Sequence, residues 1–414
     1  MAAKVLNTLQ ETESGRIEAS EHPKEASTGD YRFFFWKGRV ALYAILKALG
    51  IGPGDCVVVP GYTCVVVPGA ICFLGAKPLY VDIDPNTYNI SLHRIESALR
   101  PGDPRIKAVI VQHTYGVPAD TVPIVKWARQ NGIAVVEDCC HSLGSRYLSE
   151  AGDWQDVGTL GDAAFFSSQW SKPVTTGLGG WAATSFPALA DKIRSIHANE
   201  CIAPSWMERA VLAGQVAGRS LVSTPSLFWL AQGIYRFLGR AGLAIGSSTG
   251  AELLGEMPPG YAKRMSSFQL RLLNRKLAGF AGAIPHRRCL KAVYDHALAD
   301  AGLPVLEVPK SVDPILLRYP VRVGNKMEVL DAARRNRIEM GDWFDHPLHP
   351  RESDSRAFGY KEGMCPNAEA AATQVINLPV HDRVSEETAR KIVLFLKRVA
   401  HLRIDCPATL RVHF

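Results

Sequence analysis

Short apolar runs recur along the first half of the chain and alternate with stretches of helical periodicity. The six clearest runs cover residues 57–60, 78–82, 108–113, 133–137, 163–167 and 180–184. Their apolar residues stand at consecutive positions, which indicates strands that are buried on both faces. Alternation of such strands with helices predicts an α/β fold with a mostly parallel central sheet covered by helices. Ligands are then expected at the carboxyl ends of the strands.

The second half has a different pattern. Apolar residues at helical spacing run over 264–301, strands are expected at 304–307 and 315–323, and a last helix is expected over 385–399. We therefore expect a smaller C-terminal α+β domain over 266–414. It would follow a polar tail over 1–30 and a large α/β domain over 31–265, with the boundary near residue 265.

The segment 201–258 is unusually apolar for a connection between domains. Its residues 220–235 are uncharged, and Arg219, Arg236 and Arg240 flank them. Two interpretations are open: an oligomer interface or small core, which we favour, and contact with a membrane surface or a lipid-bearing substrate. A spanning helix is not expected, because the run is shorter than about 20 residues and contains Pro225.

Composition narrows the class of protein. A chain of 414 residues with 47% hydrophobic residues can fill two cores. Its first thirty residues are polar and show no secretory signal, so the cytoplasm is expected. Nine cysteines without CxxC pairs or metal spacing are interpreted as core residues, and no metal site is expected. The net charge of +7 favours anionic ligands, but no basic tract interleaved with aromatic residues predicts nucleic-acid binding.

The candidate chemistry lies at the ends of two predicted strands. Asp138 closes the run that begins at residue 133, and Lys172 follows the run 163–167 by five residues. A pyridoxal 5′-phosphate (PLP) enzyme needs such a pair. The lysine amine binds the cofactor aldehyde as a Schiff base, and the carboxylate keeps the pyridine nitrogen protonated. Taken singly, a lysine is typical of a solvated surface and an aspartate of a helix cap or turn.

Further motifs surround this pair. In chain order they are Gly38-Arg39-Val40 before a helical run over 41–49, His141 three residues after Asp138, a Gly-rich turn at 158–162, the run 175–180 after Lys172, the pair Arg264-Met265 and the run 376–381. From about residue 33 to residue 400 the chain resembles the DegT/DnrJ/EryC1/StrS family, the PLP-dependent sugar aminotransferases of fold type I.

The resemblance implies that Lys172 and Asp138 are the catalytic pair and that a set of residues binds PLP. This set is Gly38, Arg39, Val40, Cys64, Asp138, His141, Ser167 and Lys172. The amides at the helix start and Ser167 would bind the phosphate, and His141 would contact the phenolic oxygen. The alternatives are a plain helix cap at Gly38-Arg39-Val40, a buried structural serine at Ser167 and a core histidine at His141.

The chain departs from the family pattern at three positions. Arg39 stands where Thr is usual, so its guanidinium could bind the phosphate or point elsewhere while the amides hold the anion. Cys64 stands where an aromatic residue commonly stacks on the pyridine, so stacking passes to a neighbour such as Tyr62 or is lost. Ala262 replaces an Asn that reaches the cofactor phosphate of a partner subunit, a contact that Lys263 or Arg264 could replace.

The implied reaction moves an amino group from a donor such as glutamate to a keto group of a nucleotide-linked sugar. A cyclitol, a free sugar or a lipid-like carbonyl is the alternative substrate, and a PLP-binding regulatory protein without turnover is the alternative of another class. The presence of Lys172 argues against the dehydrating branch of the family, which carries His there. A Rossmann dehydrogenase is disfavoured because no G-x-G-x-x-G motif joins an early strand to a helix. At least a homodimer is expected, since relatives build the site from two chains.

Overall fold

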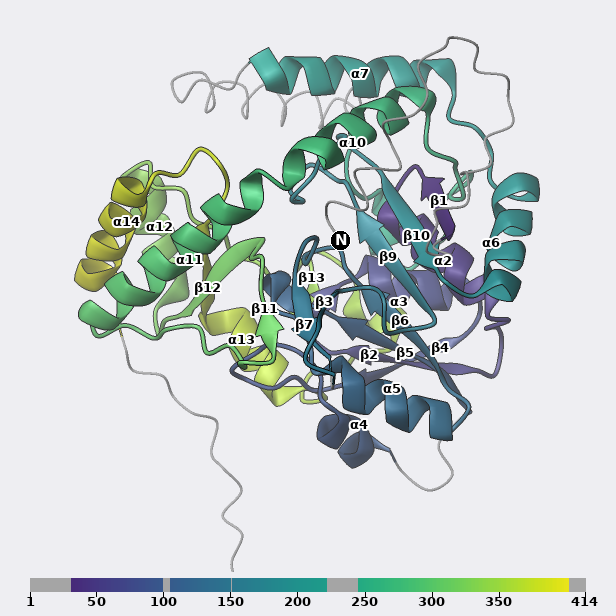
Figure 1. Cartoon of the computed structure of the whole chain (residues 1–414), viewed down its shortest axis with the longest axis horizontal. Helices are drawn as coiled ribbons and strands as arrows, with labels where there is room; N and C mark the ends of the chain where they lie inside the picture. Colours follow the sequence, from purple (N-terminus) through teal and green to yellow (C-terminus); the bar gives the residue numbers. More distant parts are fainter. Residues whose placement is uncertain (1–30, 100–104, 150, 222–244, 402–414) are drawn as a thin grey trace, which may run out of the picture.

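A seven-stranded sheet lies at the centre of the first half of the chain (Figure 1). We analysed a computed structural model, which describes residues 31–99, 105–149, 151–221 and 245–401. The strands in spatial order are β1 (Tyr31–Phe35), β10 (Gly180–Thr184), β9 (Ala163–Ser167), β6 (Ala134–Asp138), β5 (Ile106–Gln112), β2 (Cys56–Pro60) and β4 (Lys77–Val81). The five from β9 to β4 are parallel, and β10 is antiparallel to both of its neighbours. The predicted mostly parallel sheet and its six strands are confirmed.

Helices cover both faces of this sheet (Figure 1). They are α2 (Gly38–Ala48), α3 (Val66–Cys72), α4 (Leu92–Ala98), α5 (Thr121–Gln130) and α6 (Pro187–Asn199). Neighbouring residues of one strand point into different cores: Val57 and Val59 pack with residues of α2 and α6, whereas Val58 packs with residues of α4 and α5. This double burial explains why the strands are apolar at every position instead of at alternate ones.

The start of α2 sits against the ends of β9 and β10 with no room for a side chain. A Cβ atom on Gly180 would lie 2.3 Å from the Cα of Gly38, and one on Gly38 would lie 2.9 Å from the carbonyl oxygen of Phe166. Both positions therefore require glycine. The contact fixes the amino end of α2 beside Ser167, the last residue of β9.

The second half is built from helices and a small set of short strands (Figure 1). Its elements are α10 (Ser267–Phe280), α11 (Ala283–Asp300), β11 (Val312–Asp313), β12 (Arg318–Arg322), α12 (Lys326–Arg335), β13 (Leu348–His349), η2 (Ser355–Phe358), α13 (Pro366–Gln374), β14 (Val375–Pro379) and α14 (Glu386–Val399). The helical pattern over 264–301 and the last helix are confirmed. The domain boundary near residue 265 stays a prediction.

The predicted strand at 304–307 is wrong. The described chain has no strand there, and the N–H of Leu306 donates to the hydroxyl of Tyr319 at 3.0 Å instead of to a neighbouring strand. Pro304 further reduces the donors that a strand would need. Only part of the second predicted strand forms, as β12, which pairs with β14 in an antiparallel ribbon.

Short strands connect distant parts of the chain. β3 (Thr63–Cys64) pairs with β13 in parallel, so Cys64 lies opposite His349. β7 (Arg146–Leu148) pairs with both β8 (Trp154–Asp156) and β11. The short η1 helix (Thr114–Gly116) follows β5. The β3–β13 pairing matters most, because it brings residues near 349 to the carboxyl side of the central sheet.

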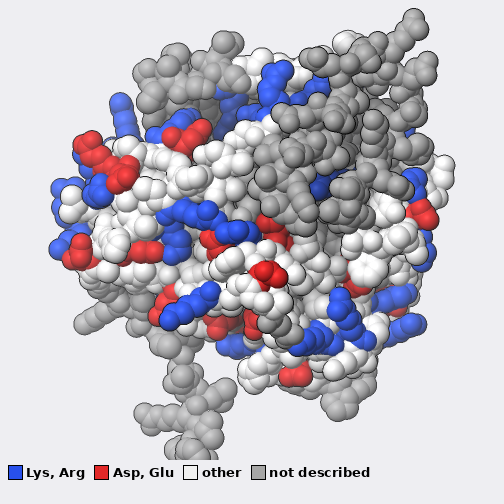
Figure 2. All heavy atoms as spheres, in the orientation of Figure 1, with Lys and Arg blue, Asp and Glu red and all other residues white. Residues whose placement is uncertain are grey.

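Helix α7 (Trp206–Leu221) and the four-residue α9 (Gly250–Leu253) are the described helices of the apolar segment. Residues 222–244 lie outside the described residues, so both interpretations of 220–235 stay predictions. None of the described helices combines the length and apolarity needed to cross a membrane. On the face shown in Figure 2, Lys and Arg side chains are interspersed with Asp and Glu.

A buried carboxylate ties β6 to the loop that precedes β9. Glu137 accepts hydrogen bonds from the N–H groups of Gly158, Leu160 and Gly161 at 2.8–2.9 Å and from the Tyr147 hydroxyl. These partners and His113 hold the pKa of Glu137 below its usual value despite its burial. The network fixes the strand residue that directly precedes Asp138.

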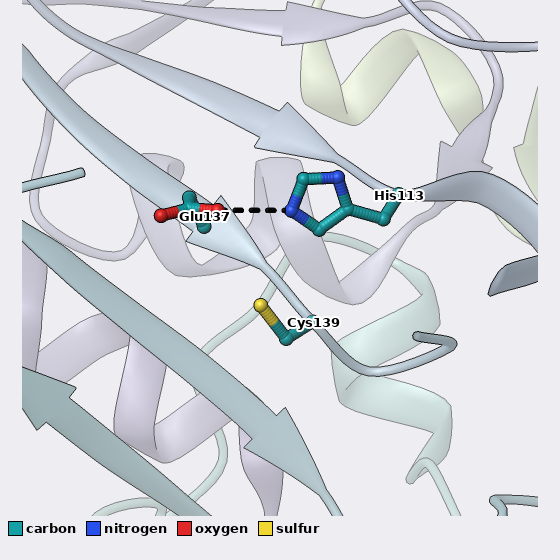
Figure 3. Close-up of side chains that lie close together, drawn as sticks. All are labelled: His113, Glu137 and Cys139. Atoms are coloured by element: carbon teal, nitrogen blue, oxygen red, sulfur yellow. Dashed lines mark hydrogen bonds and ion pairs between the residues drawn. The ribbon is translucent and has the colours of Figure 1, made fainter. Parts of the chain in front are cut away.

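His113, Glu137 and Cys139 lie close enough to hold a metal ion (Figure 3). The Nδ1 of His113 accepts from the N–H of Ala119 at 3.1 Å, so its Nε2 carries the proton that reaches Glu137 at 3.1 Å. Burial raises the pKa of the Cys139 thiol well above its usual range, which keeps it protonated. We interpret the cluster as a structural hydrogen-bond network and assign no metal to it.

Glu137→Gln should lower the free energy of unfolding at neutral pH by about 3 kcal/mol, because a buried network loses its charge and one acceptor oxygen. The folded-state pKa of Glu137 is lowered. The contribution of Glu137 to the free energy of unfolding should therefore be present above the pKa of this group in the unfolded state. It should disappear as the pH falls through the pKa of the folded state. Urea unfolding at several pH values measures both effects. Tyr147→Phe, which removes one donor only, should cost less; an equal loss in the two variants would contradict this assignment.

Candidate active site

Lys172 stands on a loop that is closed at its base. The N–H of Ser168 donates to Gly179 at 2.9 Å, and the N–H of Thr176 donates to Ser168 at 2.8 Å. The two hydroxyls of Ser168 and Thr176 are also hydrogen-bonded at 2.8 Å, and both residues are fully buried. These bonds close the connection between β9 and β10 at its base. The loop therefore holds Lys172, which is half-buried, near the carboxyl end of β9.

Asp138 ends β6, the strand next to β9. Its carboxylate accepts the N–H of Cys140 at 3.0 Å, and the residue is only 5% exposed. Burial raises the pKa of Asp138, while the nearby Lys172 charge opposes this rise. Burial lowers the pKa of Lys172, while Cys140 and Asp138 oppose that shift. The structure thus brings the two predicted residues into one buried, electrostatically coupled site.

His141 follows in the turn after Asp138. The N–H of Tyr115 donates to its Nδ1 at 3.3 Å, so the neutral ring carries its proton on Nε2. Burial, together with the charges of Lys172 and Arg318, lowers the pKa of His141 well below its usual value. His141 is therefore a neutral hydrogen-bond donor through Nε2.

The amino end of α2 offers backbone donors beside Ser167. The N-cap residue, Lys37, makes no side-chain cap, and Ser167 lies against Gly38. The N–H of Val40 donates to the carbonyl of Lys37 at 3.1 Å, so Val40 is not among the open donors. The amides of Gly38 and Arg39 remain for an anion at this helix start.

The Arg39 side chain is directed away from this position. Its Nη1 donates to Glu252 at 2.6 Å and to Ser248 at 3.0 Å, and Arg39 and Glu252 are both buried. Lys37 joins the same carboxylate at 3.3 Å, and burial lowers the pKa of Lys37 to about 8. The structure agrees with the second interpretation of Arg39, in which the guanidinium points elsewhere and only the backbone amide is available to an anion at the helix start.

Tyr62 does not replace the missing aromatic residue at position 64. It is fully buried, its hydroxyl accepts the N–H of Phe344 at 3.2 Å, and it is hydrogen-bonded to the hydroxyl of Tyr115 at 2.8 Å. Tyr115 in turn donates to the carbonyl of Trp343. Tyr62 and Tyr115 therefore hold the 343–344 backbone and do not stack in the site, whereas Cys64 remains half-buried.

Trp343 is the aromatic residue beside Lys172. The Lys172 Nζ lies 5.0 Å from the indole centroid, and the ring of His141 stacks on the indole at 5.7 Å with an interplanar angle of 21°. The sequence analysis missed Trp343, which is far from Lys172 along the chain. The only local signal is the His- and Pro-rich run at 346–350 that follows it.

The residues around Ala262 have partners within their own chain. The Lys263 ammonium pairs with Glu208, and Arg264 forms a backbone bridge with Phe35. Replacement of the family Asn contact by Lys263 or Arg264 stays a prediction.

The comparison with known families agrees with this site. A family model described as the DegT/DnrJ/EryC1/StrS aminotransferase family matches residues 35–218 and 231–397. The chain belongs to this family. Its members are aminotransferases, and the position of Lys172, Asp138 and His141 at the carboxyl ends of parallel strands is consistent with that activity.

Two curated relatives show how far the likeness extends. A UDP-2-acetamido-2-deoxy-3-oxo-D-glucuronate aminotransferase of Pseudomonas aeruginosa is 30% identical over 349 residues, which are 83% of this chain and 79% of that protein. Protein MosB of Rhizobium meliloti is 43% identical over 183 residues, which are 44% of this chain and 34% of that protein.

The fold is that of fold type I PLP-dependent aminotransferases. The S. venezuelae protein DesV, solved in complex with a ketimine intermediate, has a TM-score of 0.68 and 24% identity. The match covers 89% of this chain and 84% of the DesV chain. The predicted family and fold class are both confirmed.

Arg39→Met should lower the free energy of unfolding by about 3 kcal/mol, because it leaves the buried Glu252 without its main partner. Lys47→Met is the matched control on the same helix. It breaks an exposed ion pair with Glu200 and should cost less than about 1 kcal/mol. Chemical unfolding of both variants measures the difference, and equal losses would show that the Arg39 pair contributes no more than a surface pair.

Proposed function

We propose that this chain is a PLP-dependent aminotransferase that moves an amino group from a donor such as glutamate to a keto group of a nucleotide-linked sugar. One observation carries the proposal: a half-buried lysine and a buried aspartate lie together at the carboxyl ends of adjacent parallel strands. Such a pair is costly to bury without a ligand that uses both groups.

The donors on the site fit PLP at each of its polar groups. Lys172 would bind the aldehyde, Asp138 would face the pyridine nitrogen, and the Nε2 of His141 would donate to the phenolic oxygen. The amides of Gly38 and Arg39, together with the Ser167 hydroxyl, would hold the phosphate. The missing Cβ of Gly38 supports this cradle, since a side chain there would collide with Ser167. When bound, PLP supplies the electron sink that lets the substrate carbon lose its proton.

The residues of the chain have separate tasks in this proposal. Burial lowers the pKa of Lys172, which favours the neutral amine that accepts a proton from the substrate carbon and returns it during transfer. Asp138 stabilises a protonated pyridine nitrogen by its charge. His141, held neutral, donates one hydrogen bond without adding positive charge beside Lys172.

A nucleotide-linked keto sugar is the substrate class that the comparisons favour. The P. aeruginosa relative is named for a UDP-linked oxo sugar and aligns over most of both chains. The net charge of +7 agrees with an anionic nucleotide moiety. We further propose at least a homodimer, because the uncharged, apolar-rich sequence of residues 220–235 is a composition that favours an interface.

Borohydride reduction of the PLP-loaded protein should fix the cofactor to Lys172. The lysine is the half-buried amine beside Asp138, and its lowered pKa favours the neutral nucleophile that the aldehyde needs. Peptide mapping by mass spectrometry identifies the modified residue. An adduct on another lysine, or none, would overturn the site assignment.

Asp138→Asn should retain cofactor but reduce the rate of amino transfer by about a hundredfold or more, because the amide cannot stabilise a positive ring nitrogen by charge. Asp162→Asn is the matched control. Asp162 accepts the N–H of Val135 at 2.7 Å at the other end of the same two strands, so its replacement should leave the rate constant almost unchanged. Single-turnover kinetics with L-glutamate compare the two, and similar rates would make Asp138 structural only.

A further inference from the structure

Lys326 is a buried lysine that the site described above does not use. It is the first residue of α12, and only 3% of it is exposed. Burial lowers the pKa of Lys326 to about 8, and the helix dipole also opposes a cation in the first turn. Asp342 and Asp345 favour the charged form through space, but neither forms an ion pair with Lys326 among the described residues. A lysine in this position is therefore unfavourable unless its N–H groups have other partners.

Three backbone carbonyls accept hydrogen bonds from Lys326. Its Nζ donates to the carbonyl of Ala372 at 2.8 Å, to that of Asp342 at 3.1 Å and to that of Phe344 at 3.3 Å. An ammonium group has three N–H donors and no acceptor, so it matches three carbonyls that converge on one point. Lys326 therefore joins α12 to α13 and to the segment 342–344, a task that no neutral side chain of similar size can perform.

The two carbonyls from the segment 342–344 flank Trp343. The carbonyl of Trp343 itself accepts from the Tyr115 hydroxyl, and its N–H donates to the Oδ1 of Asn377 at 2.8 Å. The backbone of Trp343 is therefore held through both of its own polar groups and, by Lys326, through the carbonyls of both neighbours. Because both peptide groups are held in this way, the direction in which the indole leaves the backbone is fixed as well.

The indole of Trp343 lies against the groups of the candidate site. Its centroid is 5.0 Å from the Lys172 Nζ, and the rings of His141 and His349 are each centred 5.7 Å from it. These three partners come from three separate segments of the chain. A displacement of the 342–344 backbone would therefore change all of these contacts at once.

We propose that Lys326 is a positioning residue that acts on amino transfer through Trp343. This inference rests on the proposed aminotransferase function. The ammonium group fixes the carbonyls on either side of Trp343, and the indole then limits the positions open to the Lys172 side chain and the His141 ring. Proton transfer at one atom is sensitive to displacements on the order of 1 Å. A loosened indole should therefore slow transfer although Lys326 touches none of the reacting groups.

Fluorine NMR of the full chain labelled with 5-fluorotryptophan reports on the indole directly. The chain has eight tryptophans, and Trp343→Leu identifies the Trp343 signal by its loss. Lys326→Met should shift or broaden this signal, because the carbonyls of the segment 342–344 lose their shared donor. Lys326→Gln removes the charge but keeps an amide donor. It should show the same change to a smaller extent, and it takes the place of the Met variant if that variant does not fold.

Tyr80→Phe is the matched control. The Tyr80 hydroxyl donates to the carbonyl of Phe358 at 2.8 Å, so this variant also removes a buried donor from a backbone carbonyl of the second half. It should leave the Trp343 signal unchanged. In single-turnover kinetics of the PLP-loaded protein with L-glutamate, Lys326→Met should lower the rate of amino transfer about tenfold, whereas Tyr80→Phe should keep the rate of the unchanged chain.

The two measurements separate the parts of the proposal. An unchanged Trp343 signal in the Lys326 variants would overturn the positioning role itself. A changed signal together with a transfer rate equal to that of Tyr80→Phe would overturn the link between the indole and the reaction. Since the fluorine measurement requires no turnover, it tests the hold of Lys326 on Trp343 even if the proposed reaction fails.

Discussion

The pairing of the half-buried Lys172 with the buried Asp138 is the constraint on which the rest of the site depends. Removing both charges from water costs several kcal/mol each, and that cost is offset only if the surrounding structure holds them close together. The parallel sheet does this, because β6 and β9 are neighbours and end at the same edge. The Glu137 network then fixes the backbone just before Asp138, and the closed base of the 168–179 loop fixes Lys172.

A second constraint is the contact between α2 and the central sheet. Gly38 and Gly180 let the helix start approach closer than any side chain would allow, and this places two open amides beside Ser167. The adjacent Arg39 guanidinium binds Glu252 on α9 and does not enter the same space. The helix start therefore offers backbone donors for a phosphate, while the charged side chain joins α2 to a segment more than two hundred residues away.

The C-terminal half completes the site through β3 and β13. Their pairing sets His349 opposite Cys64, and the preceding residues place Trp343 against His141 and Lys172. The Trp343 carbonyl accepts a hydrogen bond from the Tyr115 hydroxyl, and the Trp343 N–H donates to the Oδ1 of Asn377, so both residues hold the Trp343 backbone. Burial, together with the charges of Lys172 and Arg318, lowers the pKa of His141, so groups from both halves of the chain act on one ring.

The sequence alone predicted the central sheet, which the structure confirms, and pointed to Asp138 and Lys172 as the candidate pair. Strands buried on both faces are apolar throughout, and ligands collect at the carboxyl ends of parallel strands, so local spacing together with the surrounding motifs singled out Asp138 and Lys172. The loop over 304–307 has a strand-like composition, but the N–H of Leu306 donates to the Tyr319 hydroxyl and Pro304 offers no donor, so no strand forms there. The direction of Arg39 and the positions of Trp343 and Arg318 were likewise decided by tertiary structure. Arg39 and Trp343 meet their partners across about 170 to 210 positions of sequence, and no local periodicity encodes a contact made by pairing between distant segments.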